Sequence, residues 1–139
     1  YTGAQVTKDM VRKWKEEFSY VNGDDREQMV ELSVEGKKQV VDIGDLIKSA
    51  CSMIIGKVGA AIKSIVASAD PEYQPILRNN IILSGGGSLI DGIADAIAND
   101  IADIGDVTVT CVDDPIEKVA TGAMALAQDM PDEQYTAIN

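Results

Sequence analysis

Apolar residues recur at nearly every fourth position near the start of the chain: Val6, Met10, Trp14, Phe18 and Val21. This spacing predicts an amphipathic helix from about residue 7 to residue 21, with Thr7 as its N-cap. Apolar positions from residue 28 to residue 43 are then interrupted by the polar residues 35–37. That pattern predicts a β-hairpin with a polar tip.

A broad apolar stripe follows: Ile47, Ala50, Cys51, Ile54, Val58, Ala61 and Ile65. It predicts one long core helix that begins with Asp45 as its cap and continues to about Ala67. Gly56 and Gly59 lie inside this helix, where we expect them to allow close packing of a neighbouring helix.

The remaining pattern alternates strands with helices. A short helical segment after Asp70 and Pro71 leads to a strand over residues 81–84, and residues 106–112 alternate as a second strand. A helix beginning near Ser88 is predicted from the spacing of Leu89, Ile93, Ile97 and Ile101. Asp114 is predicted to cap a last helix, with Pro115 in its first position, that runs to about Met130. This order predicts an α/β fold with an antiparallel addition at its front.

Composition restricts the class of protein. The chain has 139 residues, enough for one domain or a piece of a larger protein, and begins with Tyr1 rather than Met, so we expect an excised segment. Its formal charge of −11 disfavours nucleic acid and anionic membranes as direct partners. No signal peptide is recognisable, and no apolar run is expected to reach the roughly 18 residues of a membrane span. These features favour a cytoplasmic protein.

The reactive side chains are few. The chain has no histidine and no clustered cysteines, which argues against a zinc site and a histidine-dependent triad. Cys51 and Cys111 lie in separate apolar segments, so we expect two buried free thiols rather than a disulfide. No catalytic residue and no metal ligand is predicted within the chain.

The glycine-rich turn after the strand at residue 81 is the most informative candidate site. Gly85, Gly86 and Gly87 have no Cβ atom to keep a ligand away from the backbone, and a helix beginning near Ser88 would present free N–H groups to an anionic or polar ligand. The spacing matches neither a P-loop nor a dinucleotide fingerprint. A tight turn without a ligand is the alternative interpretation.

The charges on the first helix are a second candidate site. Arg12, Lys15 and Glu16 stand three and four positions apart and therefore share one face. Spacing alone favours a solvated helix with the pairs Arg12–Glu16 and Lys13–Glu17, which would leave this face without a ligand.

Two motifs together resemble the actin family. Residues 12–21 resemble the actin helix that carries a Lys-Glu pair followed by a hydrophobe and Tyr-Val, and residues 80–94 resemble the family's adenosine motif. The likeness is greatest to bacterial actin homologues of the magnetosome-filament type. It is carried by residues 15–21, 71–74, 85–88, 109–112 and 114–115, and it continues through residues 122–131.

This resemblance implies a partial actin-like ATPase fold: most of a IIB-like subdomain over residues 1–44, and the later half of a IIA-like subdomain over residues 45–139, with a mixed sheet flanked by helices. It implies that Arg12, Lys15 and Glu16 contact the ribose and adenine of ATP or ADP. Gly85, Gly86 and Gly87 would let the backbone approach ribose and phosphates, and Leu89 and Ile90 would line the base. Ile90 stands where actin has an aromatic residue, so stacking on the base would be weaker.

The family's phosphate-binding hairpins, metal-positioning aspartates and water-orienting residue would lie N-terminal to this segment. Residues 42–45 begin like such a hairpin, but Leu46 and Ile47 follow where Gly and Thr should hold phosphate. We therefore expect magnesium to be held mainly elsewhere, and we expect the isolated segment not to hydrolyse ATP, although the intact protein would.

The function implied is a filament protein that polymerises with ATP, has other copies of itself as partners, organises magnetosomes and meets a magnetosome-associated adaptor. A plasmid-segregation or cell-shape actin, a non-filament ATPase or kinase of the same superfold, and a non-catalytic scaffold are the alternatives.

Overall fold

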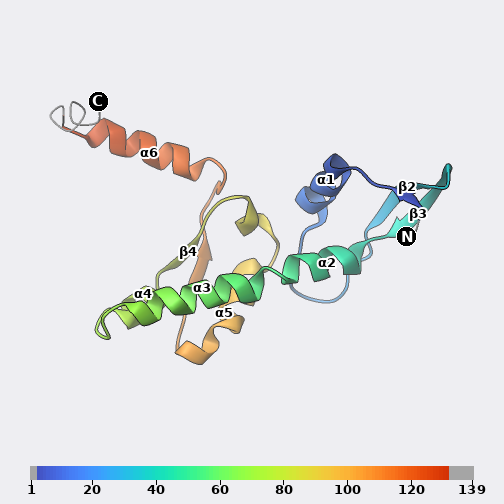
Figure 1. Cartoon of the computed structure of the whole chain (residues 1–139). Helices are drawn as coiled ribbons and strands as arrows, with labels where there is room; N and C mark the ends of the chain where they lie inside the picture. The colour runs from blue at the N-terminus through green and yellow to red at the C-terminus, as the bar shows by residue number, and fades with distance from the viewer. Residues whose placement is uncertain (1–2, 132–139) are drawn as a thin grey trace.

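The computed structural model describes residues 3–131, which form an N-terminal hairpin part and a C-terminal α/β part (Figure 1). The hairpin part consists of β1 (Ala4–Gln5), α1 (Lys8–Phe18), β2 (Met29–Val34) and β3 (Lys37–Asp42). The remaining elements are α2 (Gly44–Ser52), α3 (Ile55–Ser68), α4 (Gln74–Arg78), β4 (Ile81–Leu83), η1 (Gly86–Leu89), α5 (Ile93–Asp100), η2 (Ala102–Ile104), β5 (Val109–Cys111) and α6 (Lys118–Asp129). The predicted order of helices and strands is confirmed, except that β1 was not predicted and that two helices, α2 and α3, replace the predicted long helix.

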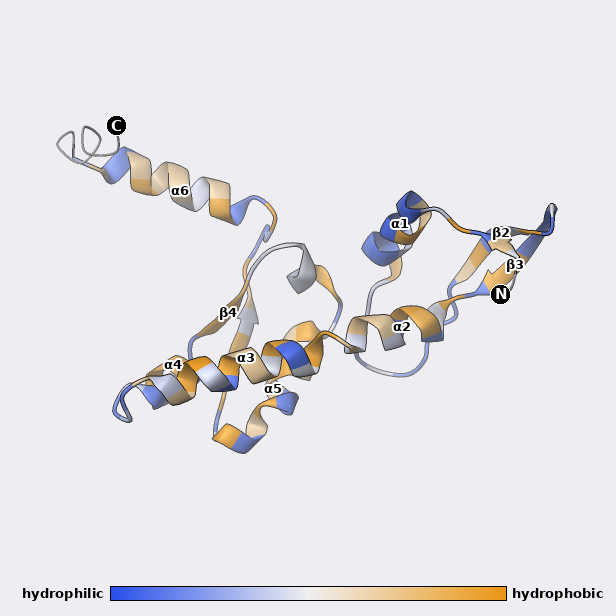
Figure 2. Ribbon diagram, viewed as in Figure 1, coloured by the Kyte–Doolittle hydropathy of each residue, from blue (hydrophilic) through white to orange (hydrophobic). Residues whose placement is uncertain are grey.

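The hairpin part is held together by one buried sheet face. The strands β1, β2 and β3 are antiparallel neighbours, and Val30 pairs with Val41 across the hairpin. The buried side chains are Val30, Leu32, Val41 and Ile43, and α1 packs on them through Met10, Trp14 and Phe18. Apart from the exposed Val11, the rest of α1 is strongly hydrophilic (Figure 2). This division follows from the predicted periodicity of the helix.

The start of α1 was predicted correctly and its end was not. The Thr7 side chain accepts a hydrogen bond from the Met10 amide, as expected of an N-cap. The helix ends at Phe18, because the backbone of Ser19 is extended and Tyr20 forms a β-bridge with Asp91. Pairing with a distant segment is a constraint that the local pattern does not contain.

The long helix predicted from Asp45 to Ala67 is two helices, α2 and α3, with a turn at Met53 and Ile54. In this turn the Ile54 amide donates to the Cys51 carbonyl, three residues back, which interrupts the α-helical ladder. The prediction of Asp45 as the N-cap was also wrong. Ile43, not Asp45, occupies the N-cap position of α2. The amide of Gly44, the first residue of the helix, donates a hydrogen bond to the Asp42 carboxylate.

The segment Gly44–Ser68 is long and apolar enough to cross a membrane by length and composition, with a mean hydropathy of 1.5 over its best window. The prediction that no apolar run reaches the length of a membrane span was therefore wrong. Only 17% of that window is buried among the described residues, with Cys51 and Val66 among its buried side chains, while Ile47 packs against the buried clusters of both parts. Ile47 thereby links the hairpin part to the α/β part.

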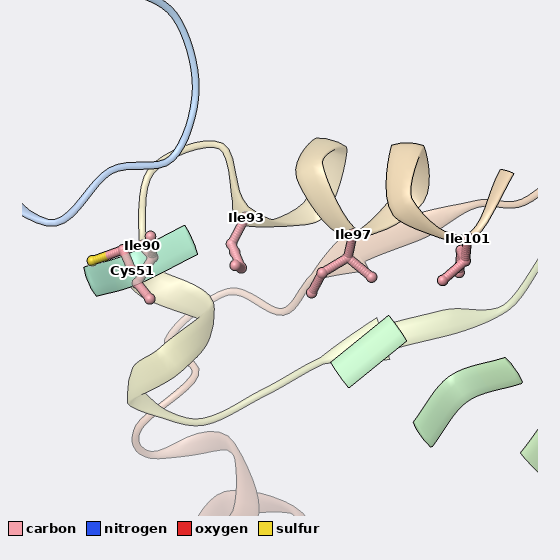
Figure 3. Close-up of a cluster of buried hydrophobic side chains, with 5 residues drawn as sticks. All are labelled: Cys51, Ile90, Ile93, Ile97 and Ile101. Carbon is pink, nitrogen blue, oxygen red and sulfur yellow. The ribbon is translucent and has the colours of Figure 1, made fainter. Parts of the chain in front are cut away.

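The α/β part is built on a parallel pair of strands. Ile81, Ile82 and Leu83 of β4 pair with Val109, Thr110 and Cys111 of β5. The connection between them passes through α5, which packs against α3. Its core residues are Cys51, Ile90, Ile93, Ile97 and Ile101 (Figure 3). The α/β class is confirmed, although the hairpin strands and the parallel pair form separate sheets rather than one mixed sheet.

The two helical glycines differ in their surroundings. Gly59 is buried against α5, where a Cβ atom would meet Asp100 and Ile101, so the predicted close packing is confirmed there. A Cβ atom on Gly56 would meet nothing within 4 Å, so that prediction was wrong for this position. The position of each glycine along α3 accounts for the difference, because Gly56 lies in the first turn of the helix and only Gly59, one turn later, is in contact with Asp100 and Ile101 at the end of α5.

Several boundaries in the C-terminal half differ from the prediction. The helix expected near Ser88 is the short 3₁₀ turn η1, and α5 begins only at Ile93, after Gly92 in the left-handed region. Leu89 therefore lies outside the buried face of α5. The strand β5 is shorter than predicted. Glu117 rather than Asp114 is the N-cap of α6, because Asp114 has a positive φ and starts a preceding turn.

The cysteines are both free, as expected. Cys51 is buried, but Cys111 is exposed at the end of β5, so the prediction of two buried thiols was wrong for Cys111. The alternation that predicted the strand does not show which of its faces is covered. The division of the chain between residues 44 and 45 remains a prediction.

Candidate functional site

The end of α1 and the glycine turn meet in space. A cavity of about 130 Å³ lies between them, and its lining combines α1, η1 and the segment that follows β5: Lys15, Glu16, Ser19, Gly86, Leu89 and Ile116. Of the predicted site residues, Lys15, Glu16, Gly86 and Leu89 are brought together here. The lining offers both signs of charge, one hydroxyl, open backbone and two apolar walls.

Backbone hydrogen bonds hold these segments at this spacing. The Asp91 amide donates to the Ser19 carbonyl at 3.2 Å, and the Val21 amide donates to the Asp91 carbonyl at 2.9 Å. Asp91 follows η1 by two residues, whereas Ser19 directly follows α1. The two walls of the cavity are thus joined by main-chain pairing, which is stiffer than a contact between side chains.

The glycine turn has one glycine that the fold requires and two that it does not. Gly85 has a φ of +86°, a conformation that other residues rarely adopt, and its amide donates to the Pro115 carbonyl. Gly86 and Gly87 have no such φ, and a Cβ atom on either would meet nothing within 4 Å. Neither backbone conformation nor packing among the described residues explains these two glycines.

No ion pair within residues 3–131 involves a charged side chain of α1. The ion pairs in that range are Arg26–Asp91, Lys38–Glu31, Lys48–Asp25 and Lys63–Asp103. The pairs Arg12–Glu16 and Lys13–Glu17, expected of a solvated helix, do not form. Lys15 and Glu16 are therefore free to meet a polar group in the cavity.

The other predicted site residues lie elsewhere. Ile90 is only 9% exposed and packs in the core beside Ile93, so its side chain supports the turn from behind. Gly87 lines a neighbouring apolar cavity of about 330 Å³ between α3, β4 and α5. Arg12 is exposed on α1. Neither Arg12 nor Gly85 lines the cavity of about 130 Å³ described above, which we call the α1 cavity.

Two lining residues escaped the sequence analysis. Ser19 was seen only as part of the α1 motif, and Ile116 only as part of the last helix. Ile116 is 70% exposed, directly after Pro115. Its apolar character in a turn flanked by acidic residues was a signal that could have marked it.

Larger cavities exist, and their chemistry is less suited to a polar ligand that also has an apolar part. One of about 440 Å³ is lined by Asn22, residues 88–95 and Cys111, without a cationic side chain. The cavity of about 130 Å³ is smaller than the roughly 300–1,000 Å³ of complete ligand pockets, so the described residues alone do not enclose such a pocket. In residues 3–131, no group of three or more His, Cys, Asp or Glu is placed to hold a metal.

The sequence matches known proteins over most of its length. The model of the MreB/Mbl protein family matches residues 4–135. The actin-like protein MamK of Paramagnetospirillum magneticum is 33% identical over 121 residues, 87% of this chain and 35% of the relative. MamK of Magnetospirillum gryphiswaldense is 32% identical over 121 residues, 87% of this chain and 34% of the relative. The chain thus spans about a third of these relatives.

Solved structures give the same result. The chain superposes on a subunit of the MamK double helical filament with a TM-score of 0.88 at 31% identity, covering 94% of this chain and 40% of that one. A non-polymerising MamK mutant bound to AMPPNP matches with a TM-score of 0.82 at 31% identity, covering 91% of this chain and 39% of that one. The family match agrees with the fold and with the motifs at α1 and the glycine turn. The chain belongs to the MreB/Mbl family of actin-like proteins.

Proposed function

We propose that this chain supplies the adenosine-binding wall of a MamK-like filament protein that binds ATP or ADP, polymerises in the cytoplasm and organises magnetosomes. The observation that carries the proposal is the cavity in which Lys15, Glu16, Gly86 and Leu89 meet. The family membership and the AMPPNP-bound relative support a nucleotide as the ligand.

The lining residues suit an adenine nucleoside. A carboxylate such as Glu16 accepts hydrogen bonds from ribose hydroxyls, and Lys15 offers donors to base or ribose. Leu89 and Ile116 present apolar surface to the faces of the base, while Gly86 allows the ligand to approach the backbone. Magnesium and the phosphates would be held mainly by residues outside this segment, which accords with the small size of the cavity.

Self-association is the second part of the proposal. A head-to-tail contact between identical subunits does not close and produces an open filament. The filament in which the MamK relative was solved supports such a contact for this family member. A magnetosome-associated adaptor is proposed as an additional partner.

The nucleotide proposal is tested by the Gly86→Ala variant of the full-length protein. Because a Cβ atom on Gly86 meets nothing within 4 Å, the variant should fold normally. If adenosine lies against this backbone, the affinity for ADP should fall about fivefold to 150-fold, in line with the roughly 1–3 kcal/mol cost of overpacking. The measurement is calorimetric titration with ADP.

The matched control is Gly122→Ala in α6, where a Cβ atom also meets nothing within 4 Å and which does not line the cavity. This control should bind ADP as the wild type does. An unaltered ADP affinity in Gly86→Ala, or an absence of saturable binding by the wild type, would contradict the proposed site. Sedimentation of the wild type with and without ATP tests polymerisation, and persistent monomers at high concentration with ATP would argue against a filament.

A further inference from the structure

Asp91 lies at the junction of the hairpin part and the α/β part, where both its main chain and its side chain form polar contacts. Its main chain pairs with Ser19 and Val21, as described above. Its carboxylate forms an ion pair with the Arg26 guanidinium, with 2.6 Å between Arg26 Nη2 and Asp91 Oδ2. The same Nη2 atom donates to the Asn22 side-chain oxygen at 3.1 Å.

Arg26 is itself positioned by a buried aromatic ring. The guanidinium carbon lies 4.6 Å from the centre of the Tyr20 ring, a cation–π geometry. The Arg26 amide donates to the Tyr20 hydroxyl at 2.9 Å, and Tyr20 is fully buried. These contacts limit the rotamers of Arg26 before it meets Asp91, so less conformational entropy is lost in forming the pair.

The backbone on both sides of this cluster is closely packed. The Arg26 carbonyl lies so near Gly44 that a Cβ atom there would overlap it. A Cβ atom on Gly92 would overlap the Asn22 side chain, so the chain after Asp91 also has little room to shift. The cluster of Tyr20, Asn22, Arg26 and Asp91 therefore connects two segments whose backbones are each held in place by close packing.

We propose that Arg26 is a positioning residue for nucleoside binding. By holding Asp91 against Tyr20, it sets the separation between the end of α1 and the glycine turn. Leu89, two residues before Asp91, and Ser19, next to Tyr20, line the cavity from its two sides. This inference depends on the proposed function, since it assigns Arg26 a role in forming the same site without contacting the ligand.

The experiment compares Asp91→Ala with Asp103→Ala in the full-length protein. Asp103 also forms an ion pair, with Lys63, at 2.7 Å, and its side chain is 67% exposed against 54% for Asp91. The Lys63–Asp103 pair joins α3 to η2 and does not touch the α1 cavity. Both variants remove one exposed ion pair, but only Asp91→Ala removes the side-chain link to Arg26 beside the cavity, while the main-chain bonds of residue 91 to Ser19 and Val21 stay in place.

We expect Asp91→Ala to weaken ADP binding about threefold to fivefold, the upper part of the range available to an exposed ion pair. Asp103→Ala should bind ADP as the wild type does, although the melting temperatures of the two variants should fall similarly. The double variant Arg26→Asp with Asp91→Arg should recover most of the lost affinity. A purely structural role of the pair would change melting temperature without this selective effect on affinity.

The outcomes separate the two proposals. If the wild type does not bind ADP, the proposed function fails. If the wild type binds ADP and Asp91→Ala, folded, binds it equally well, the nucleotide site stands and the positioning role is overturned. Equal loss of affinity in Asp91→Ala and Asp103→Ala would also overturn it. Should Asp91→Ala fail to fold, Arg26→Gln replaces it, with the same expected loss of affinity and the same contradicting result.

Discussion

Gly59 on α3 lies so close to Ile101 that a Cβ atom on the glycine would stand 3.1 Å from the isoleucine Cγ2. The Asp100 carboxylate is nearer still, and Ile101 is fully buried. The two helices can approach this closely only because α3 has no side chain at that point. The contact fixes α5, and through α5 the turn that leads back to Asp91 and the cavity.

Gly59→Ala should therefore lower the free energy of unfolding by about 1–3 kcal/mol, the usual cost of overpacking a close contact. Gly56→Ala is the matched variant on the same helix, where a Cβ atom meets nothing within 4 Å. It should stabilise the protein by about 0.5–1 kcal/mol, because alanine has the higher helix propensity. Urea denaturation measures both, and equal effects of the two substitutions would contradict the packing described.

The difference between the two glycines illustrates how far the sequence could predict this fold. Apolar periodicity located α1, the hairpin, β4 and the apolar face of α5 because each depends on spacing within one segment. It could not reveal the turn at Met53 and Ile54, where an apolar stripe continues across a break in hydrogen bonding. Nor could it show that α5 passes Gly59 and not Gly56, because that depends on packing between distant segments.

The same distinction applies to the candidate site. Lys15 and Gly86 could be selected from two motifs by their resemblance to the actin family, and the structure places both on one cavity. Ile116 was missed because it reaches the cavity through the position of the segment after β5, not through a motif. Ile90 was selected with Leu89 as a base-lining pair, yet Leu89 is the last residue of the 3₁₀ turn η1 and Ile90 begins an extended segment, so the two side chains have different surroundings.

Acid sensitivity is expected at the junction of β3 and α2. The Asp42 carboxylate accepts hydrogen bonds from the amides of Gly44, at 2.9 Å, and Gln28, at 2.8 Å. These bonds hold the pKa of Asp42 below its ordinary value of 3.8, the Gly44 bond contributing most. Because the folded pKa is lowered, the contribution of the charge to stability is fully present above the ordinary value. It is lost as the pH falls through the folded pKa.

Asp42→Ala should thus destabilise the protein at neutral pH, and Asp42→Asn, which keeps an acceptor oxygen, should destabilise it less. The stability difference between wild type and Asp42→Asn should shrink as the pH is lowered beneath 3.8. Asp45→Ala is the control, because Asp45 provides no side-chain cap to α2. Thermal unfolding monitored across an acid pH series checks this. A constant difference between wild type and Asp42→Asn would be inconsistent with a lowered pKa.

The two thiols should differ in reactivity. Burial raises the pKa of Cys51, which reduces the fraction of reactive thiolate, and the thiol is also shielded, whereas Cys111 is exposed. Brief treatment of the native protein with iodoacetamide should label the peptide containing Cys111 well before the peptide containing Cys51. Mass spectrometry of the digested protein measures both, and unfolding in guanidinium should make the rates similar. Faster labelling of Cys51 in the native state would contradict its placement in the core.

Leu89 and Ile90 are neighbours in the chain with opposite surroundings, and they separate binding from stability. Leu89 is 56% exposed and lines the α1 cavity, whereas Ile90 is 9% exposed and packs in the core with Cys51. Leu89→Ala should leave the unfolding free energy nearly unchanged while weakening ADP binding, because it removes apolar surface offered to the base. Ile90→Ala should lower the unfolding free energy by about 2–5 kcal/mol through the cavity it leaves.

Leu46→Ala controls for the loss of an exposed leucine away from the cavity, since Leu46 is 62% exposed on α2. It should bind ADP with wild-type affinity. Calorimetric titration and urea denaturation on the three variants give one binding and one stability value for each. If Leu89→Ala and Leu46→Ala bind ADP equally well, the base does not contact Leu89. Since Leu89 is the apolar residue that η1 contributes to the cavity, the nucleoside would then have to lie along Ile116 and the α1 side chains instead.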